Sequence, residues 1–150
     1  MKNNTPLFHG DIIEGNRILY TASPFAKGNL TYLQEVGYLK ARKPHISSRS
    51  YLPSYLFFLV LSGSGTLDYH GEHYKLSEND CVFIDCTAPY SHNTSDDLWQ
   101  IAWIHFNGPT MPGIYTKYQE RGGLPVFCPK QQSNFDALYA SLKDIYNIAD

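Results

Sequence analysis

Short apolar runs separated by tight-turn signals fill residues 55–108, and this rhythm constrains the fold more than any other feature of the chain. The turn signals are Gly63-Ser64-Gly65, His70-Gly71, Asn79-Asp80 and Ala88-Pro89. Short runs at such spacing, without long helical segments between them, are typical of an antiparallel sheet folded into a barrel or sandwich. We therefore expect strands at residues 55–61, 66–70, 73–76, 81–86, 90–94 and 98–106.

The segments before this region carry weaker signals. Residues 1–15 are polar and predict an arm with little structure of its own, followed by a short strand at 17–21 and a loop at 23–29. Residues 31–40 predict the first strand of the main fold, although their apolar positions fit a helix almost as well. Residues 41–53 are basic and predict a solvated connector, with Arg49 as the exception considered below.

The last third of the chain predicts helices. Residues 114–121 fit a short helix that ends at Gly122-Gly123, and residues 126–127 fit one more short strand. Ser133 is a suitable N-cap for an amphipathic helix whose apolar stripe contains Phe135, Leu138, Leu142 and Ile145. Because no helix-stop signal precedes Asp150, we expect the natural chain to continue beyond it.

Composition limits the function classes. The 150 residues contain 43% hydrophobic side chains, enough for one domain with a sizeable core. A net charge of −2 provides no electrostatic reason to bind DNA or an acidic membrane directly. Neither a secretion signal nor a membrane-spanning stretch is recognisable, so we expect a cytoplasmic protein.

The three cysteines do not form a disulfide framework. Cys81 and Cys86 lie an odd number of positions apart in one expected strand, so their side chains point to opposite faces and cannot bond each other. Cys128 could reach one of them, but free thiols in a reducing cytosol are the preferred interpretation.

Even spacing places three large side chains on one face of the last expected strand: Trp99, Trp103 and His105. An indole wall can stack on the apolar face of a sugar or another flat ligand, although most buried tryptophans serve only in core packing. The sequence therefore predicts an aromatic-walled cavity. It shows neither a nucleophile elbow around Ser64 nor a phosphate-binding loop, so catalysis of those kinds is not expected.

An ordered set of short motifs carries a resemblance. The set comprises Arg49, Tyr55-Leu56-Phe57-Phe58-Leu59-Val60-Leu61-Ser62-Gly63-Ser64-Gly65, Tyr74-Lys75-Leu76, Asp80, Phe83-Ile84, Pro89, His92, Trp99, Trp103-Ile104-His105-Phe106 and Gly108. Together they resemble the N-terminal effector-binding domain of AraC-type transcriptional regulators. The resemblance implies a mainly β fold, namely a cupin-like antiparallel β barrel (jelly roll) followed by a C-terminal amphipathic helix.

The resemblance also implies the domain plan. Residues 1–29 would form the arm and lead-in, residues 30–128 the barrel, and residues 129–150 the start of a dimerisation helix region. A homodimer would form through Phe135, Leu138, Leu142 and Ile145. DNA would be bound only by a separate helix-turn-helix domain beyond Asp150, and the effector would be a small molecule, in first place a sugar.

The resemblance and the residue chemistry together suggest a ligand site. Arg49 matches an effector-binding arginine at the barrel mouth, and Trp103 matches a sugar-stacking position. His92, Trp99 and His105 are further candidate contacts, each of which could instead be structural. His92 also occupies a position where metal-dependent cupins keep a ligand.

No cofactor and no metal are expected. His92 lacks converging partners, because His70 and His73 lie three residues apart across a turn. The rival hypothesis is a metal-dependent cupin enzyme, such as an isomerase or dioxygenase. A binding module without a regulatory partner is a third alternative.

Overall fold

The computed structural model describes residues 9–95 and 98–150, with side chains placed outside 9–13 and 42–47. The strands are β1 (His9–Leu19), β2 (Tyr32–Arg49), β3 (Tyr55–Ser62), β4 (Ser64–Tyr69), β5 (Glu72–Ser77), β6 (Cys81–Asp85), β7 (Tyr90–Thr94), β8 (Trp99–Asn107) and β9 (Val126–Phe127). The helices are α1 (Pro24–Asn29), α2 (Met111–Glu120) and α3 (Gln132–Ala149). The mainly β prediction is confirmed, and none of the described helices is long and apolar enough to cross a membrane.

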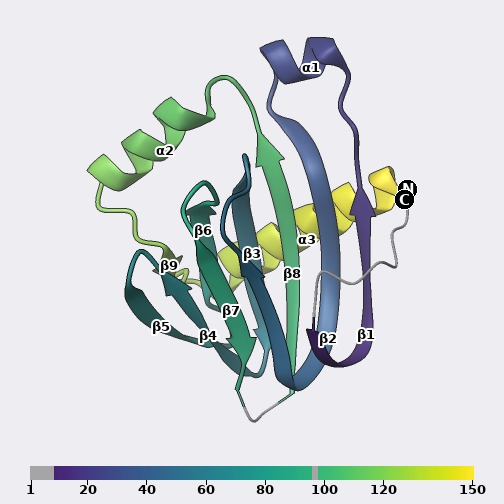
Figure 1. Ribbon diagram of the computed structural model, residues 1–150, viewed down its shortest axis with the longest axis vertical. Helices are drawn as coiled ribbons and strands as arrows, with labels where there is room; N and C mark the ends of the chain where they lie inside the picture. The colour runs from purple at the N-terminus through teal and green to yellow at the C-terminus, as the bar shows by residue number, and fades with distance from the viewer. Residues whose placement is uncertain (1–8, 96–97) are drawn as a thin grey trace.

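All strands pair antiparallel in the order β5-β4-β7-β2-β8-β3-β6-β9, with β1 added on β2. The long strand β2 joins two layers, because its first part pairs with β8 and residues 46–49 pair with β7. The layer of β4, β5 and β7 then faces the layer of β1, β2, β8 and β3 (Figure 1). The result is a jelly-roll sandwich, whose sheet does not close into the continuous barrel that was predicted.

Three N-terminal predictions were wrong. Residues 9–15 are not an unstructured arm, because they belong to β1 and pair along β2; residues 1–8 lie outside the described residues. The predicted loop at 23–29 contains α1, which Pro24 begins and which Ser23 caps by accepting a hydrogen bond from the backbone N–H of Ala26 at 3.1 Å. The predicted connector is strand as far as Arg49, since two partners, β1 and β7, satisfy its backbone.

The interior between the layers is apolar over most of its length. Side chains from both layers fill it, including Trp99, Leu67 and Ile101, all at most 1% exposed. Trp99, Ile101 and Trp103 share this interior face, as their even spacing predicted. Burial of this cluster removes apolar surface from water and is the main force that holds the two layers together.

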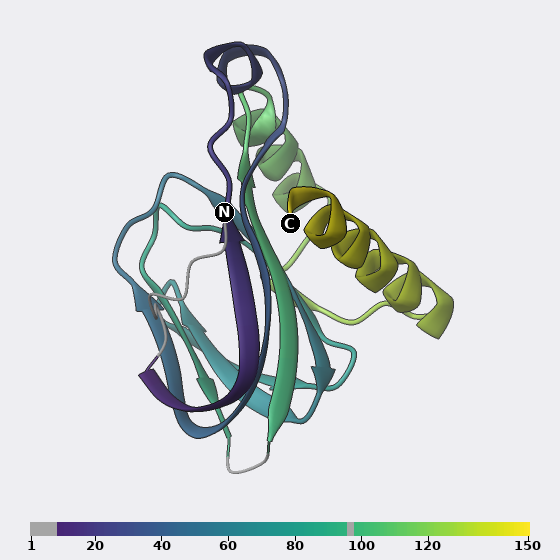
Figure 2. The ribbon, with the colours of Figure 1, turned by 90° about the vertical axis from the view of Figure 1, so that its right-hand side faces the viewer.

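The outer face of the β1-β2-β8-β3 layer is covered by helices (Figure 2). Tyr115 of α2 packs on Tyr55 and Phe83, with ring centroids 5.4 and 5.2 Å apart. α2 begins at Met111 rather than at residue 114, and Gly122 stands just beyond its end with a φ of +85°, the left-handed conformation expected there.

α3 differs from the prediction in its start, and its apolar stripe faces the sheet. The helix begins at Gln132 after Gln131, so Ser133 is not the N-cap. Phe135 and Leu142 are 4% and 6% exposed, because they pack within the same chain on a cluster that contains Leu59. These two residues therefore belong to the intramolecular core, and their part in a dimer interface stays a prediction. Leu138, which packs against the same cluster, and Ile145 are partly buried.

Candidate functional site

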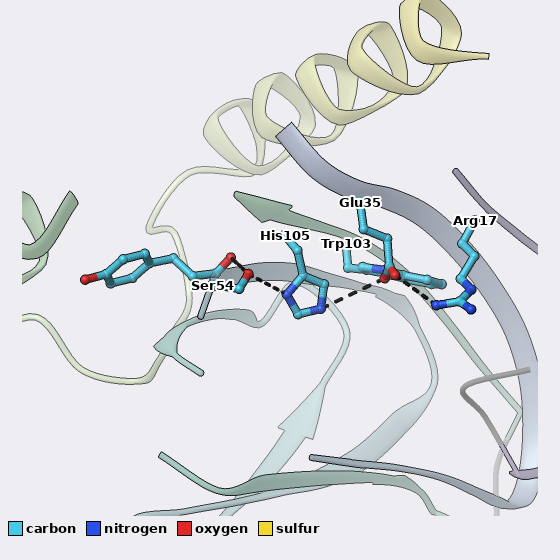
Figure 3. Close-up of polar contacts among 6 residues, drawn as sticks. Arg17, Glu35, Ser54, Trp103 and His105 are labelled. Carbon is cyan, nitrogen blue, oxygen red and sulfur yellow. Dashed lines mark hydrogen bonds and ion pairs between the residues drawn. The ribbon is translucent and has the colours of Figure 1, made fainter. Parts of the chain in front are cut away.

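A buried polar network lies at one end of the interior, and a carboxylate is at its centre. Glu35 of β2 accepts hydrogen bonds from the Trp103 indole N–H (2.6 Å) and from an Arg17 guanidinium nitrogen (3.0 Å) (Figure 3). Arg17, Glu35, Trp103 and His105 are each at most 7% exposed. Charge-assisted bonds of this kind offset part of the cost of burying the two ions.

The pleat of the sheet places these groups together. Glu35 of β2 lies opposite His105 of β8, and Gly37 lies opposite Trp103. Arg17 of β1 lies opposite Gly37 on the other side of β2. Because alternate residues share a face, all the side chains point to the interior. A Cβ at Gly37 would lie 2.6 Å from the Trp103 ring, so the indole reaches Glu35 only because this position has no side chain.

His105 extends the network toward β3. Its Nδ1 lies 2.9 Å from the Ser54 hydroxyl, and its Nε2 lies 4.0 Å from the Glu35 carboxylate. Burial lowers the pKa of His105 to about 4, and this effect outweighs the nearby negative charge of Glu35. The ring is therefore neutral at pH 7, and the 4.0 Å contact is not an ion pair. The Ser54 hydroxyl also donates to the backbone carbonyl of Tyr55 at 3.2 Å, and the tautomer of His105 sets the direction of its bond with Nδ1.

Arg49 brings a second cation to the same end of the interior. It is half-buried at the end of β2, opposite Tyr90 of β7. Its positive charge contributes to lowering the pKa of His105, which places it within electrostatic range of the network. Among the described residues no carboxylate forms an ion pair with Arg49. A pocket of about 300 Å³ opens beside it, between the end of β2, the β4–β5 turn and the start of β7.

His92 and Trp99 lie deeper in the same interior. The His92 ring is 5.2 Å from that of Phe58 and 6.0 Å from that of Trp99, measured between centroids. Both side chains are buried, at 6% and 0% exposure, and Trp99 fits because Gly65 beneath it has no side chain. The five predicted ligand contacts thus share one interior, but only Trp103 and His105 belong to the Glu35 network.

Sequence reasoning missed Arg17, Glu35 and Ser54. The available signal was an acidic residue at an inward position of an otherwise apolar strand, since a buried carboxylate requires a partner. That signal could not be used while residues 31–40 also fitted a helix. Arg17 was placed correctly in a strand but without a contact, because its partner lies on another strand.

Two other predictions concern metals and thiols. In the part of the chain that the structure describes, no three His, Cys, Asp or Glu side chains gather as metal ligands would. His73 instead contacts Asp68 at 2.6 Å on the exposed face. All three cysteines are free, and Cys81 and Cys86 belong to clusters on opposite faces of the sheet, as predicted. Burial raises the pKa of each of these two thiols to about 12.

Comparison with known proteins supports the fold. No curated protein matches the chain significantly. The plu4264 protein of Photorhabdus luminescens is similar over 73% of this chain and 86% of its own, with 14% identity and a TM-score of 0.50. YhaK of Escherichia coli is similar over 67% of this chain and 49% of its own, with 12% identity and a TM-score of 0.52. The cupin domain of Schizosaccharomyces pombe Cnp3 is similar over 76% of each chain, with 10% identity and a TM-score of 0.49.

At these identities the plu4264 and YhaK structures show a shared fold and nothing more. Family membership rests on a different comparison. The model of the AraC-like ligand binding domain matches residues 34–149, which include every strand from β3 onward and the whole of α3. The resemblance inferred from the ordered motifs is thereby confirmed, and the chain belongs to the family of AraC-like ligand binding domains.

Proposed function

We propose that this chain is the effector-sensing domain of a transcriptional regulator and that a small polar molecule, in first place a sugar, binds beside Arg49 and Glu35. The observation that carries the proposal is a half-buried guanidinium without an ion-pair partner among the described residues, at the end of the interior where Glu35 and His105 lie. A guanidinium and a carboxylate offer donors and acceptors that suit neighbouring hydroxyl groups.

A thermal-shift screen of pentoses and hexoses tests this proposal, because a ligand that binds only the folded state raises its stability. Arg49→Ala and Trp103→Ala should each weaken binding of a sugar found in this way by about 1–3 kcal/mol. Arg121→Ala, at an exposed position beyond α2, is the matched control. If both site variants bind the sugar as tightly as the parent, the effector binds elsewhere.

In this proposal the signal reaches α3 through β1. Neighbouring residues of β1 point to opposite faces: Arg17 contacts Glu35 inside, and the Asn16 side chain donates a hydrogen bond to the Tyr146 hydroxyl of α3 at 2.5 Å. A ligand that engages Glu35 would alter the Arg17 contact and hence the position of β1 under α3. The ligand can shift the equilibrium between the two positions of β1 and α3 by no more than the difference between its binding free energies for them.

Hydrogen exchange of the α3 amides tests this route. Ligand should change their exchange in the parent, and Asn16→Ala should remove that change while leaving ligand affinity nearly intact. An unchanged response in Asn16→Ala would exclude β1 as the route.

The remaining parts of the proposal concern assembly and chemistry. We place a homodimer on the solvent-facing side of α3, DNA binding in a separate helix-turn-helix domain, and the whole regulator in the cytoplasm. Sedimentation of the purified domain tests the dimer. In this proposal the domain is not an enzyme. The alternative is a metal-dependent cupin enzyme, which requires close to one metal ion per chain after mild chelation. Elemental analysis measures this metal content.

A further inference from the structure

A cavity of about 270 Å³ lies between α3 and the outer face of the sheet, on the side of β2 and β8 away from the polar network. Its floor is apolar and consists of Val36 and Ala102, which are 1% and 4% exposed. The space exists because Ala102 is small and lies between Tyr38 and Leu59 on the neighbouring strands. α3 bridges this gap instead of filling it.

Aromatic rings form the walls of this cavity. Tyr38 of the sheet and Tyr146 of α3 meet edge to face, with ring centroids 5.6 Å apart, and Tyr139 lies one helical turn before Lys143. Rings arranged in this way present apolar surface together with ring edges, and a flat aromatic ligand can pack against both. The volume is close to the lower end of the range for small-molecule sites, which is about 300 Å³.

Charge distinguishes this cavity from an ordinary packing gap. Among the described residues that line it, Lys143 is the one charged side chain and none is acidic. The Lys143 ammonium lies 4.4 Å from the centroid of the Tyr139 ring, and no carboxylate of the described chain forms an ion pair with it. An anionic group at the rim would therefore meet a cation and, from the described lining residues, no negative charge. Asn147 adds an amide at the same rim.

We propose that the cavity under α3 is a second small-molecule site and that it takes an aromatic carboxylate. The ring would lie on Ala102 between the tyrosines, and the carboxylate would face Lys143. Because the site is on the outer face of the sheet, it is separate from the proposed effector site beside Arg49. An occupant would contact Tyr146, the α3 residue that also bonds Asn16 of β1, and would thereby bias how α3 lies on the sheet.

Phenylacetate is a suitable probe, with phenylacetamide as its uncharged counterpart. In calorimetric titration of the parent chain, phenylacetate should bind at millimolar concentration and phenylacetamide more weakly. Lys143→Met should weaken phenylacetate binding roughly fivefold, the effect of one partly exposed ion pair, and should leave phenylacetamide unchanged. Lys130→Met, at an exposed position before α3, is the matched control and should bind as the parent does.

A variant that fills the cavity tests the location. Ala102→Leu should abolish binding of the probe while the circular dichroism spectrum stays native. If this variant does not fold, nuclear Overhauser contacts from phenylacetate to the Tyr139 and Tyr146 rings in the parent decide the question. Contacts to the tryptophan indoles instead, equal binding to Lys143→Met, or no binding at millimolar concentration would each overturn the proposal. None of these results depends on whether a sugar binds beside Arg49.

Discussion

Replacement of Glu35 by glutamine should destabilise the fold by about 3 kcal/mol, the lower end of the range for breaking a buried ion pair. The variant keeps the size of the side chain and an oxygen that can accept the Trp103 N–H, so no cavity forms. What it removes is the negative charge that lies 3.0 Å from Arg17, whose side chain is only 8% exposed. The guanidinium would then remain buried without this counter-charge.

A double-mutant cycle separates this effect from simple packing. Arg17→Met alone should cost a similar amount, because it leaves the Glu35 carboxylate buried with only hydrogen-bond donors. The double variant should lose less than the sum of the two, with an interaction free energy above about 1 kcal/mol, since neither charge is then left behind.

The assay is urea unfolding followed by tryptophan fluorescence, at pH 7 and moderate salt. The midpoint should shift while the slope with denaturant stays constant, which indicates a change in stability and not in compactness. Two results would refute the reasoning: a Glu35→Gln effect below about 0.5 kcal/mol, or additive single variants. Either would mean that the two side chains do not share a buried contact in solution.

Three further predictions concern stability. Gly37→Ala should destabilise the fold by about 1–3 kcal/mol in urea unfolding, because its Cβ would lie 2.6 Å from a packed indole, whereas Gly113→Ala has open space and should be neutral or stabilising. The free energy of unfolding should fall by roughly 3 kcal/mol in total as the pH drops from 6.5 to 4, because the unfolded chain then binds a proton at His105 that the folded chain does not. Urea unfolding at several pH values should show that His105→Gln loses this dependence. Circular dichroism should show that Leu142→Glu unfolds the domain and that Ala140→Glu, on the exposed side of α3, does not. A folded Leu142→Glu variant would instead support a place for Leu142 in an intermolecular interface.

Local chemistry was enough to predict most of the sheet. The turn signals between residues 63 and 89 predicted the strands from β3 to β7 to within two residues, because glycine, proline and asparagine act on the backbone where they stand. The inward face of β8 also followed from the sequence, since the side chains of a strand alternate with a fixed period. These features depend on neighbours along the chain.

The long strand β2 shows where such reasoning ends. Residues 41–49 are basic and polar and read as a connector, yet they are strand because β1 and β7 provide hydrogen-bond partners for their backbone. The same holds for residues 9–15, whose strand conformation is set by pairing with β2. Strand pairing between distant segments is decided by the whole fold, which a local pattern does not contain.

The apolar stripe of α3 was visible in the sequence, but its partner was not. An amphipathic helix must cover its apolar face, and a second helix or a sheet satisfies that requirement equally well. In the tertiary structure the sheet covers this face, and Phe135 and Leu142 are buried beside Leu59.

By itself, the sequence determined the fold class, the family and the inward tryptophan face, because each depends on residue types in a fixed order. Only the tertiary structure decided that Arg17, Glu35, Trp103 and His105 form one buried network, and that Ala102 leaves a cavity under α3. These residues lie on three strands and come together through the register of β1, β2 and β8. A shift of one residue in that register would turn the same side chains to the opposite face.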